Sequence, residues 1–289
     1  MGVMQFAKPV AVGVDGSAVS MDAVRWAAHA AALHDTDLDI IYAVEGVSAP
    51  MVEYSVPANY FDRAGAIAET VLAEARAVAE SEKPDTPQVR THIKQDSARK
   101  ALLTWSEDSS LIVVGASGSG RVSSALLGSV ASAVMTHAPC PAVVIRDQVL
   151  ERPDTGLITV GIDGSPSSLR ALEFAVDEAV LRSAALDLVS IWDSTGFDYT
   201  DTGYAAARPE IERRLGEKAE EIHAQHPDLV VGADVLEESP VDVLTKASAV
   251  SDLVVVGSRG HGGFTGLLLG STSQKLLYHT QSPLMIVRD

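Results

Sequence analysis

A glycine-rich motif occurs twice in this chain at identical internal spacing. Each copy follows an apolar run and reads Gly-x-x-Gly, nine further residues, then Gly-Ser. Its members are Gly115, Gly118, Gly128 and Ser129 in the first copy and Gly257, Gly260, Gly270 and Ser271 in the second. Because the copies lie 142 residues apart (115 to 257, and 128 to 270), the 289 residues predict two tandem domains, 1–148 and 149–289.

Each half also begins alike, with an apolar run that ends in Asp-Gly-Ser at Asp15 and at Asp163. Ser17 and Ser165 suit the N-cap of a following helix. Apolar runs then alternate with helical patterns, which predicts an α/β fold with two tandem open five-stranded parallel sheets and helices on both faces of each. The predicted strands are 10–14, 38–44, 89–93, 111–115 and 142–145, then 158–162, 186–192, 230–235, 253–257 and 284–287.

Irregular segments at 45–59 and 193–207 are expected to precede helices at 64–80 and 209–225. The expected strand order in each sheet is 3-2-1-4-5, with strands one and four adjacent where ligands bind such sheets. Asp15 and the first glycine loop would then meet in one crevice. Strand three is expected at one edge because Arg90 and His92 interrupt its apolar pattern.

Strand five forms the other predicted edge and is entirely apolar. Exposed apolar edges are normally covered, since they otherwise pair with other chains. We therefore expect self-association through strand five of each domain, either within the chain or between chains.

Composition excludes several classes of partner. A net charge of −17 disfavours nucleic acid and anionic membrane surfaces, which attract basic proteins. Cys140 is the single cysteine, so neither an intrachain disulfide nor a thiolate metal cluster can form. The first residues do not resemble a signal peptide, and no apolar run is long enough to span a bilayer, which favours the cytoplasm.

The glycine loops have the properties of phosphate cradles. Glycine permits close approach of the backbone and positive φ angles, while Ser129 and Ser271 stand at predicted helix starts, where the dipole favours anions. A duplicated structural loop is the alternative. The P-loop motif is excluded because Arg121 and Val122 replace its Lys and Ser/Thr.

These motifs resemble the ATP-binding branch of the universal stress protein family over essentially the whole chain. The resemblance implies a Rossmann-like, adenine nucleotide alpha hydrolase-like fold and bound ATP with Mg²⁺. It implies that the aspartates contact the nucleoside and that the ends of the second strands read adenine. The implied contacts are Gly13, Asp15, Ala43, Gly115, Gly118, Arg121, Gly128, Ser129 and Val130, and then Gly161, Asp163, Ile191, Gly257, Arg259, Gly260, Gly270, Ser271 and Thr272.

The first loop departs from the family pattern, with Ser117 where the second loop has Arg259. The first site is therefore expected to bind more weakly or to use Arg121. The resemblance implies a nucleotide-dependent regulator of stress or dormancy. A slow ATPase, a binder of another adenine nucleotide such as cyclic AMP, and an interaction protein with empty loops remain alternatives. We favour the regulator because no general base is evident at the loops.

Overall fold

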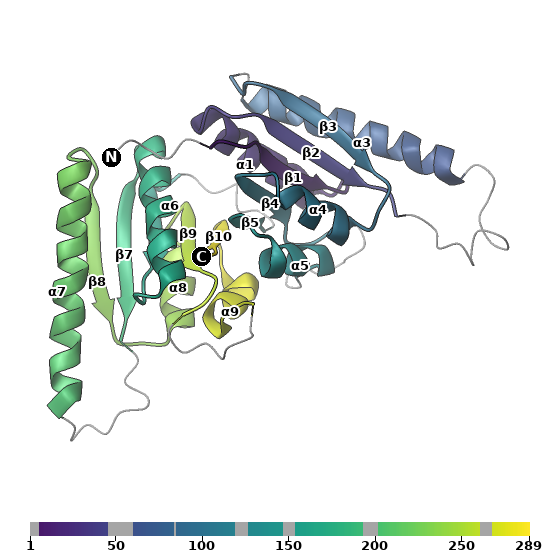
Figure 1. The fold of residues 1–289 in the computed structure, drawn as a ribbon. Helices are drawn as coiled ribbons and strands as arrows, with labels where there is room; N and C mark the ends of the chain where they lie inside the picture. The colour runs from purple at the N-terminus through teal and green to yellow at the C-terminus, as the bar shows by residue number, and fades with distance from the viewer. Residues whose placement is uncertain are drawn as a thin grey trace. The chain divides into compact units, whose positions relative to one another are not determined.

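The computed structural model describes residues 6–45, 60–83, 85–118, 127–146, 154–192, 202–260 and 268–289. The chain divides into two compact units, Gln5–Leu150 and Glu151–Asp289 (Figure 1). Each unit is an α/β domain with its own parallel sheet. Within the described residues no helix is both long and apolar enough to cross a bilayer.

The sheet of the first domain has the predicted strand order. Its strands are β1 (Val10–Val14), β2 (Leu38–Ala43), β3 (Val89–Lys94), β4 (Leu111–Gly115) and β5 (Ala142–Ile145). They pair in parallel in the order β3-β2-β1-β4-β5. Val12 of the central strand lies in register with Ile40 on one side and Val113 on the other. The expectation that strand three lies at an edge is confirmed.

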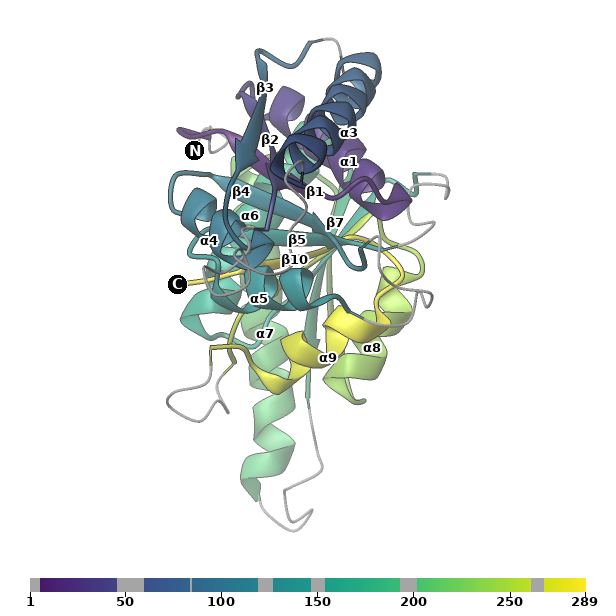
Figure 2. The same ribbon diagram turned by 90° about the vertical axis from the view of Figure 1, so that its right-hand side faces the viewer.

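Helices cover both faces of this sheet (Figures 1 and 2). Those on one face are α1 (Ala18–Leu33) and α3 (Tyr60–Glu82), and those on the other are α4 (Ala98–Ser106) and α5 (Ser129–His137). Small residues let α1 approach the strands closely, since Ala23, Ala27 and Ala31 are fully buried. Ser17 caps this helix by accepting a hydrogen bond from the Ser20 N–H, as predicted.

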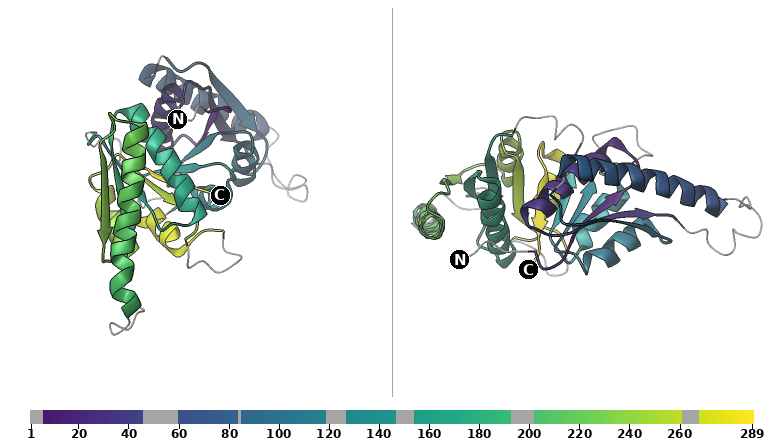
Figure 3. Two further views of the ribbon diagram at one scale, coloured as in Figure 1. Left: turned by 60° about the vertical axis from the view of Figure 1, so that its left-hand side comes forward. Right: turned by 90° about the horizontal axis from the view of Figure 1, so that it is seen from above.

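The second domain repeats this topology. Its strands are β6 (Leu157–Gly161), β7 (Ala185–Ile191), β8 (Val231–Leu236), β9 (Leu253–Gly257) and β10 (Leu284–Val287). They pair in parallel in the order β8-β7-β6-β9-β10. Its helices are α6 (Pro166–Arg182), α7 (Thr202–Gln225), α8 (Pro240–Ser248) and α9 (Ser271–His279). Figure 3 shows α7 running along β8, and α8 and α9 packing together.

Two helices begin earlier than the sequence pattern predicts. Helix α3 starts at Tyr60, and α7 starts at Thr202, so Pro209 lies inside α7 and does not begin it. Three consecutive alanines precede Arg208, and alanine has the highest helix propensity, which favours helix on both sides of the proline. The rest of the predicted irregular segments, 46–59 and 193–201, lies outside the described residues.

The second strands carry an aspartate at matching positions, and its surroundings differ between the domains. In the first domain Asp39 is 4% exposed. Its Oδ1 accepts hydrogen bonds from Arg90 Nε at 2.7 Å and from His92 Nε2 at 3.0 Å, and its Oδ2 accepts one from Trp105 Nε1 at 3.3 Å. Burial by itself raises the pKa of Asp39, but these bonds and the Arg90 charge more than offset it and hold the pKa below its ordinary value.

In the second domain Asp187 has none of these partners. Gly232 lies opposite Asp187 in the register of β7 and β8, and Asp234 lies two residues further along β8. No described residue donates a hydrogen bond to the Asp187 carboxylate. Burial, and then repulsion from Asp234, raise the pKa of Asp187 above its ordinary value.

Candidate functional site

The turn after β1 places an aspartate at the carboxyl end of the sheet. Asp15 Oδ1 accepts hydrogen bonds from the Ser17 N–H at 3.0 Å and the Ser17 hydroxyl at 2.6 Å. Gly16, between Asp15 and Ser17, has a φ of +83°, a conformation that residues other than glycine rarely adopt. One carboxylate oxygen of Asp15 therefore fixes the turn, so Asp15 has a structural role in addition to any contact with a ligand.

The other oxygen of Asp15 faces the glycine loop. A Cβ atom added to Gly118 would lie 2.6 Å from Asp15 Oδ2. At Gly115 an added Cβ would lie 3.0 Å from Val19 and 3.2 Å from its backbone carbon. Gly115 and Gly118 thus allow an approach of the loop to β1 and α1 that a side chain would obstruct. Their expected positive φ angles are not present; among the described residues, positive φ occurs at turn glycines such as Gly16 and Gly164.

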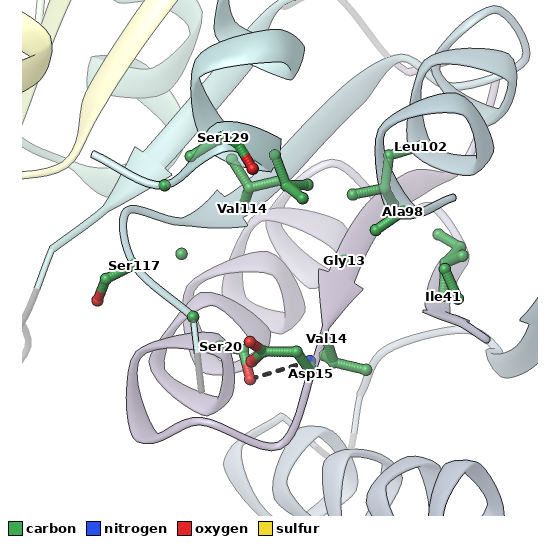
Figure 4. A pocket seen from close by; sticks show the side chains of 16 residues that line it. Gly13, Val14, Asp15, Ser20, Ile41, Ala98, Leu102, Val114, Ser117 and Ser129 are labelled. Atoms are coloured by element: carbon green, nitrogen blue, oxygen red, sulfur yellow. Dashed lines mark hydrogen bonds between the residues drawn. The ribbon is translucent and has the colours of Figure 1, made fainter. Parts of the chain in front are cut away.

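A cavity of about 300 Å³ opens where these elements meet (Figure 4). It brings together eight of the nine residues expected in the first site. Its lining consists of Gly13, Val14, Asp15, Ser20, Ile41, Ala43, Ala98, Leu102, Val114, Gly115, Ser117, Gly118, Gly128, Ser129, Val130 and Ala131. The ninth expected residue, Arg121, lies outside the described residues.

The cavity has a polar side and an apolar side. Asp15, Ser117 and Ser129 lie toward one side, while Ile41 and the side chains of α4 lie toward the other (Figure 4). Helix α5 begins at the polar side, and its N-cap, Gly128, provides no side-chain hydrogen bond. The first N–H groups of α5 therefore lack the side-chain cap that Ser17 gives α1, and a helix start of this kind favours an anion.

The second domain repeats most of this geometry. Asp163 Oδ1 accepts hydrogen bonds from the Ser165 N–H at 3.0 Å and the Ser165 hydroxyl at 2.6 Å. A Cβ added to Gly260 would collide with Asp163 Oδ2, as one added to Gly118 would with Asp15 Oδ2. Helix α9 also starts with a glycine N-cap, Gly270, that makes no side-chain hydrogen bond.

Comparison with known proteins identifies the family. The family model described as the universal stress protein family matches residues 7–146 and 156–288. The universal stress protein Rv2623 of Mycobacterium tuberculosis is 32% identical over 285 residues, which is 97% of this chain and 96% of that protein. The chain belongs to the universal stress protein family. A Mycolicibacterium smegmatis universal stress protein is 33% identical over 284 residues, 96% of each chain.

Solved structures agree with this universal stress protein in fold. The crystal structure of a universal stress protein from Archaeoglobus fulgidus aligns with a TM-score of 0.72 and 20% sequence identity, covering 97% of this chain and 96% of that one. A protein of unknown function from Pseudomonas aeruginosa, PA1789, aligns with a TM-score of 0.62 and 15% identity, covering 97% and 92%. The family that the motifs predicted is confirmed, including the tandem arrangement of two domains.

Sequence reasoning missed the apolar side of the cavity in this universal stress protein. Ala98 and Leu102 of α4 line it, and an added Cβ at Gly13 would lie 2.6 Å from Leu102. Gly161 faces Leu244 of α8 in the same way, at 3.1 Å. The spacing of Ala98 and Leu102, four residues apart, puts both on one face of α4, but it does not show that this face meets β1.

The remaining expected residues of the second site lie at matching places. Ile191 ends β7, as Ala43 ends β2. Gly257 ends β9, and Ser271 and Thr272 begin α9. The Arg259 guanidinium donates to Asp289 Oδ2 at 2.8 Å, and its expected role toward phosphate stays a prediction.

Proposed function

We propose that this universal stress protein binds ATP with Mg²⁺ and acts as a nucleotide-dependent regulator in stress or dormancy. The observation that carries the proposal is the cavity of the first domain. It combines a glycine loop, a helix start without a side-chain cap and an aspartate at the carboxyl ends of β1 and β4. Its volume of about 300 Å³ suits a small ligand.

The two sides of the cavity match the two ends of a nucleotide. We propose that phosphates lie against the backbone of Gly118 and Gly128 and the start of α5, where N–H groups offset their charge. The adenine would then lie against Ile41, Ala98 and Leu102. Asp15 lies on the polar side, where we propose that its carboxylate contacts the ribose hydroxyls.

The cation is proposed to enter with the phosphates. Among the described residues no three His, Cys, Asp or Glu side chains are grouped so as to hold a metal ion. Mg²⁺ is commonly held by substrate phosphates with few protein ligands, which is compatible with such a site.

Binding is favoured over rapid hydrolysis by the chemistry of the lining. Phosphoryl transfer requires positive charge near the γ-phosphate and a group that positions water. Among the described residues that line the cavity of the first domain, none is Lys, Arg or His. Asp15, the carboxylate in the described part of the lining, already holds the turn at Ser17. A slow ATPase is the second candidate.

Calorimetric titration of nucleotide-stripped protein with Mg-ATP tests the proposal. Gly118→Ala should weaken binding at the first site by tenfold or more, because the new Cβ displaces Asp15. Gly65→Ala is the matched control, since an added Cβ at Gly65 meets no atom within 4 Å. Tight binding of cyclic AMP but not ATP would overturn the choice of ligand, and turnover above about one per second would overturn the choice of regulator.

Self-association and location are further parts of the proposal. The fifth strands, Ala142-Val-Val-Ile145 and Leu284-Met-Ile-Val287, are entirely apolar. We propose that they pair with each other or with those of another chain, and that the protein acts in the cytoplasm. Lys substituted for Val143 or Met285 should change the mass measured by light scattering if these strands join chains.

A further inference from the structure

The glycine loops of the two domains differ in one charged residue. Arg259 stands where the first domain has Ser117. Its guanidinium donates to the carboxylate of Asp289 at 2.8 Å, and the two side chains are 50% and 41% exposed. The one arginine in the described part of either loop is therefore already occupied by a carboxylate.

The backbone of Arg259 is held as well. The carbonyl oxygen of Arg259 accepts a hydrogen bond from Ser167 Oγ at 2.5 Å. The N–H of Arg259 donates to Ser167 Oγ at 3.3 Å. The first domain has Val19 in the place of Ser167 and so lacks this hydroxyl. None of the described hydrogen bonds joins Ser117 to α1. We call Ser167, Arg259 and Asp289 the Arg259 cluster.

The cluster connects the loop to the end of the last strand. Asp289 follows β10 by two residues, and the Ser258 N–H donates to the Val287 carbonyl at 2.7 Å. The side-chain pair of Arg259 and Asp289 therefore adds a second link beside a backbone one. In the first domain the Ala116 N–H makes the same backbone bond to Ile145, also at 2.7 Å. Within the described residues, the ionic link and the Ser167 hydroxyl together distinguish the second loop from the first.

We infer that Asp289 competes with ligand phosphates for Arg259 and thereby makes the second site selective for highly charged nucleotides. This inference rests on the proposed function. A guanidinium binds carboxylate and phosphate through the same kind of N–H group, and Asp289 accepts from Nη2 of Arg259. A phosphate that approaches this edge of the guanidinium must therefore displace Asp289. A triphosphate carries more charge to do this than a monophosphate. The second site therefore discriminates ATP from AMP more strongly than the first site does.

The test is a calorimetric titration of the full chain with Mg-ATP and with AMP. Asp289→Asn removes the competing charge and should tighten binding at the second site by about two- to fivefold, with a larger gain for AMP. Asp289→Glu keeps the charge and should restore the wild-type affinity. Asp228→Asn is the control for net charge, because Asp228 is exposed and lies outside the Arg259 cluster.

A second mutant background, Arg259→Gln, tests whether the effect of Asp289→Asn depends on Arg259. In Arg259→Gln the Asp289→Asn change should have no effect on binding, whereas Gly118→Ala should leave the second-site gain intact. Equal affinities in wild type and Asp289→Asn, or a gain that persists in Arg259→Gln, would overturn the inference while leaving ATP binding established. Absence of nucleotide binding to every variant would overturn the proposed function together with it.

Discussion

The two domains share a topology but treat the aspartate of the second strand in opposite ways. Asp39 is surrounded by Arg90, His92 and Trp105, and its pKa is lowered. The pKa of Asp187 is raised, first by burial and then by the neighbouring charge of Asp234. The difference arises in the edge strand, where Arg90 and His92 of β3 correspond to Gly232 and Asp234 of β8. A repeated fold can therefore keep its site motifs while its edge strand changes charge.

Asp39→Asn should change the stability of its domain more than any other substitution proposed for these two aspartates. The substitution removes the charge that Arg90 and His92 face in a nearly buried position, and hydrogen bonds to charged groups are worth about 1.5–3 kcal/mol. The first domain should lose about 2 kcal/mol of unfolding free energy. Hydrogen exchange followed by peptide mass spectrometry would assign the loss to the first domain. An equal loss in both domains would contradict the local explanation.

The domains should respond to acid in opposite directions. The folded pKa of Asp39 is lowered, so ionised Asp39 stabilises the first domain above the unfolded pKa near 3.8. This stabilisation is lost as pH falls through the folded pKa. The folded pKa of Asp187 is raised, so its contribution to the stability of the second domain is complete below the unfolded pKa near 3.8. This contribution is lost as pH rises through the folded pKa. Domain-resolved urea unfolding between about pH 3 and pH 6 measures both slopes, each at most about 1.4 kcal/mol per pH unit.

Asp187→Asn should stabilise the second domain at pH 7. It removes a like-charge pair on neighbouring strands, which is worth about 0.2–1 kcal/mol. The gain should disappear below the unfolded pKa of aspartate, because the wild-type carboxyl is protonated there. Urea midpoints of the mutant and wild type at pH 7 and pH 3 provide the measurement. A loss of stability at pH 7 would mean that Asp187 has a partner beyond the described residues.

The smallest expected change in stability comes from replacing Asp234 of β8 with histidine, the residue at the matching position of β3. Asp234→His should give Asp187 a histidine neighbour on the edge strand, as His92 is for Asp39. The gain should be about 0.5 kcal/mol and larger at pH 6 than at pH 8, since histidine is charged only at the lower pH. Thermal unfolding at both pH values measures it, with Asp228→His as the exposed control. Equal gains at the two positions would indicate an effect of net charge alone.

The sequence predicted the sheets well because buried parallel strands leave a direct signal. Strands β1, β4, β5, β9 and β10 have the predicted bounds, since each is an apolar run between turn residues. The start of α7 was predicted at Pro209, but the helix begins at Thr202. Proline is common in the first turn of a helix, so its position alone does not locate the true start. Local patterns therefore located the strands more accurately than the helix ends.

The candidate site was predictable where it depends on the loop and not where it depends on packing between distant elements. The repeated glycines located the cavity. The contact of Leu102 with Gly13 and the ion pair of Arg259 with Asp289 could not be read from the sequence, because both join segments that only the folded topology brings together. The same reason explains why the hydrogen-bond partners of Asp39 and the proximity of Asp234 to Asp187 were not foreseen.

The contact between Gly118 and Asp15 also limits how this chain can change through mutation. Any side chain at position 118 displaces a carboxylate whose other oxygen holds the turn at Ser17. Mutations at positions 15 and 118 are therefore epistatic, and their order matters. Shortening Asp15 first would make room for alanine at 118, whereas the reverse order passes through a strained intermediate. Since Asp163 and Gly260 stand in the same relation, each domain carries its own copy of this constraint and can lose it independently.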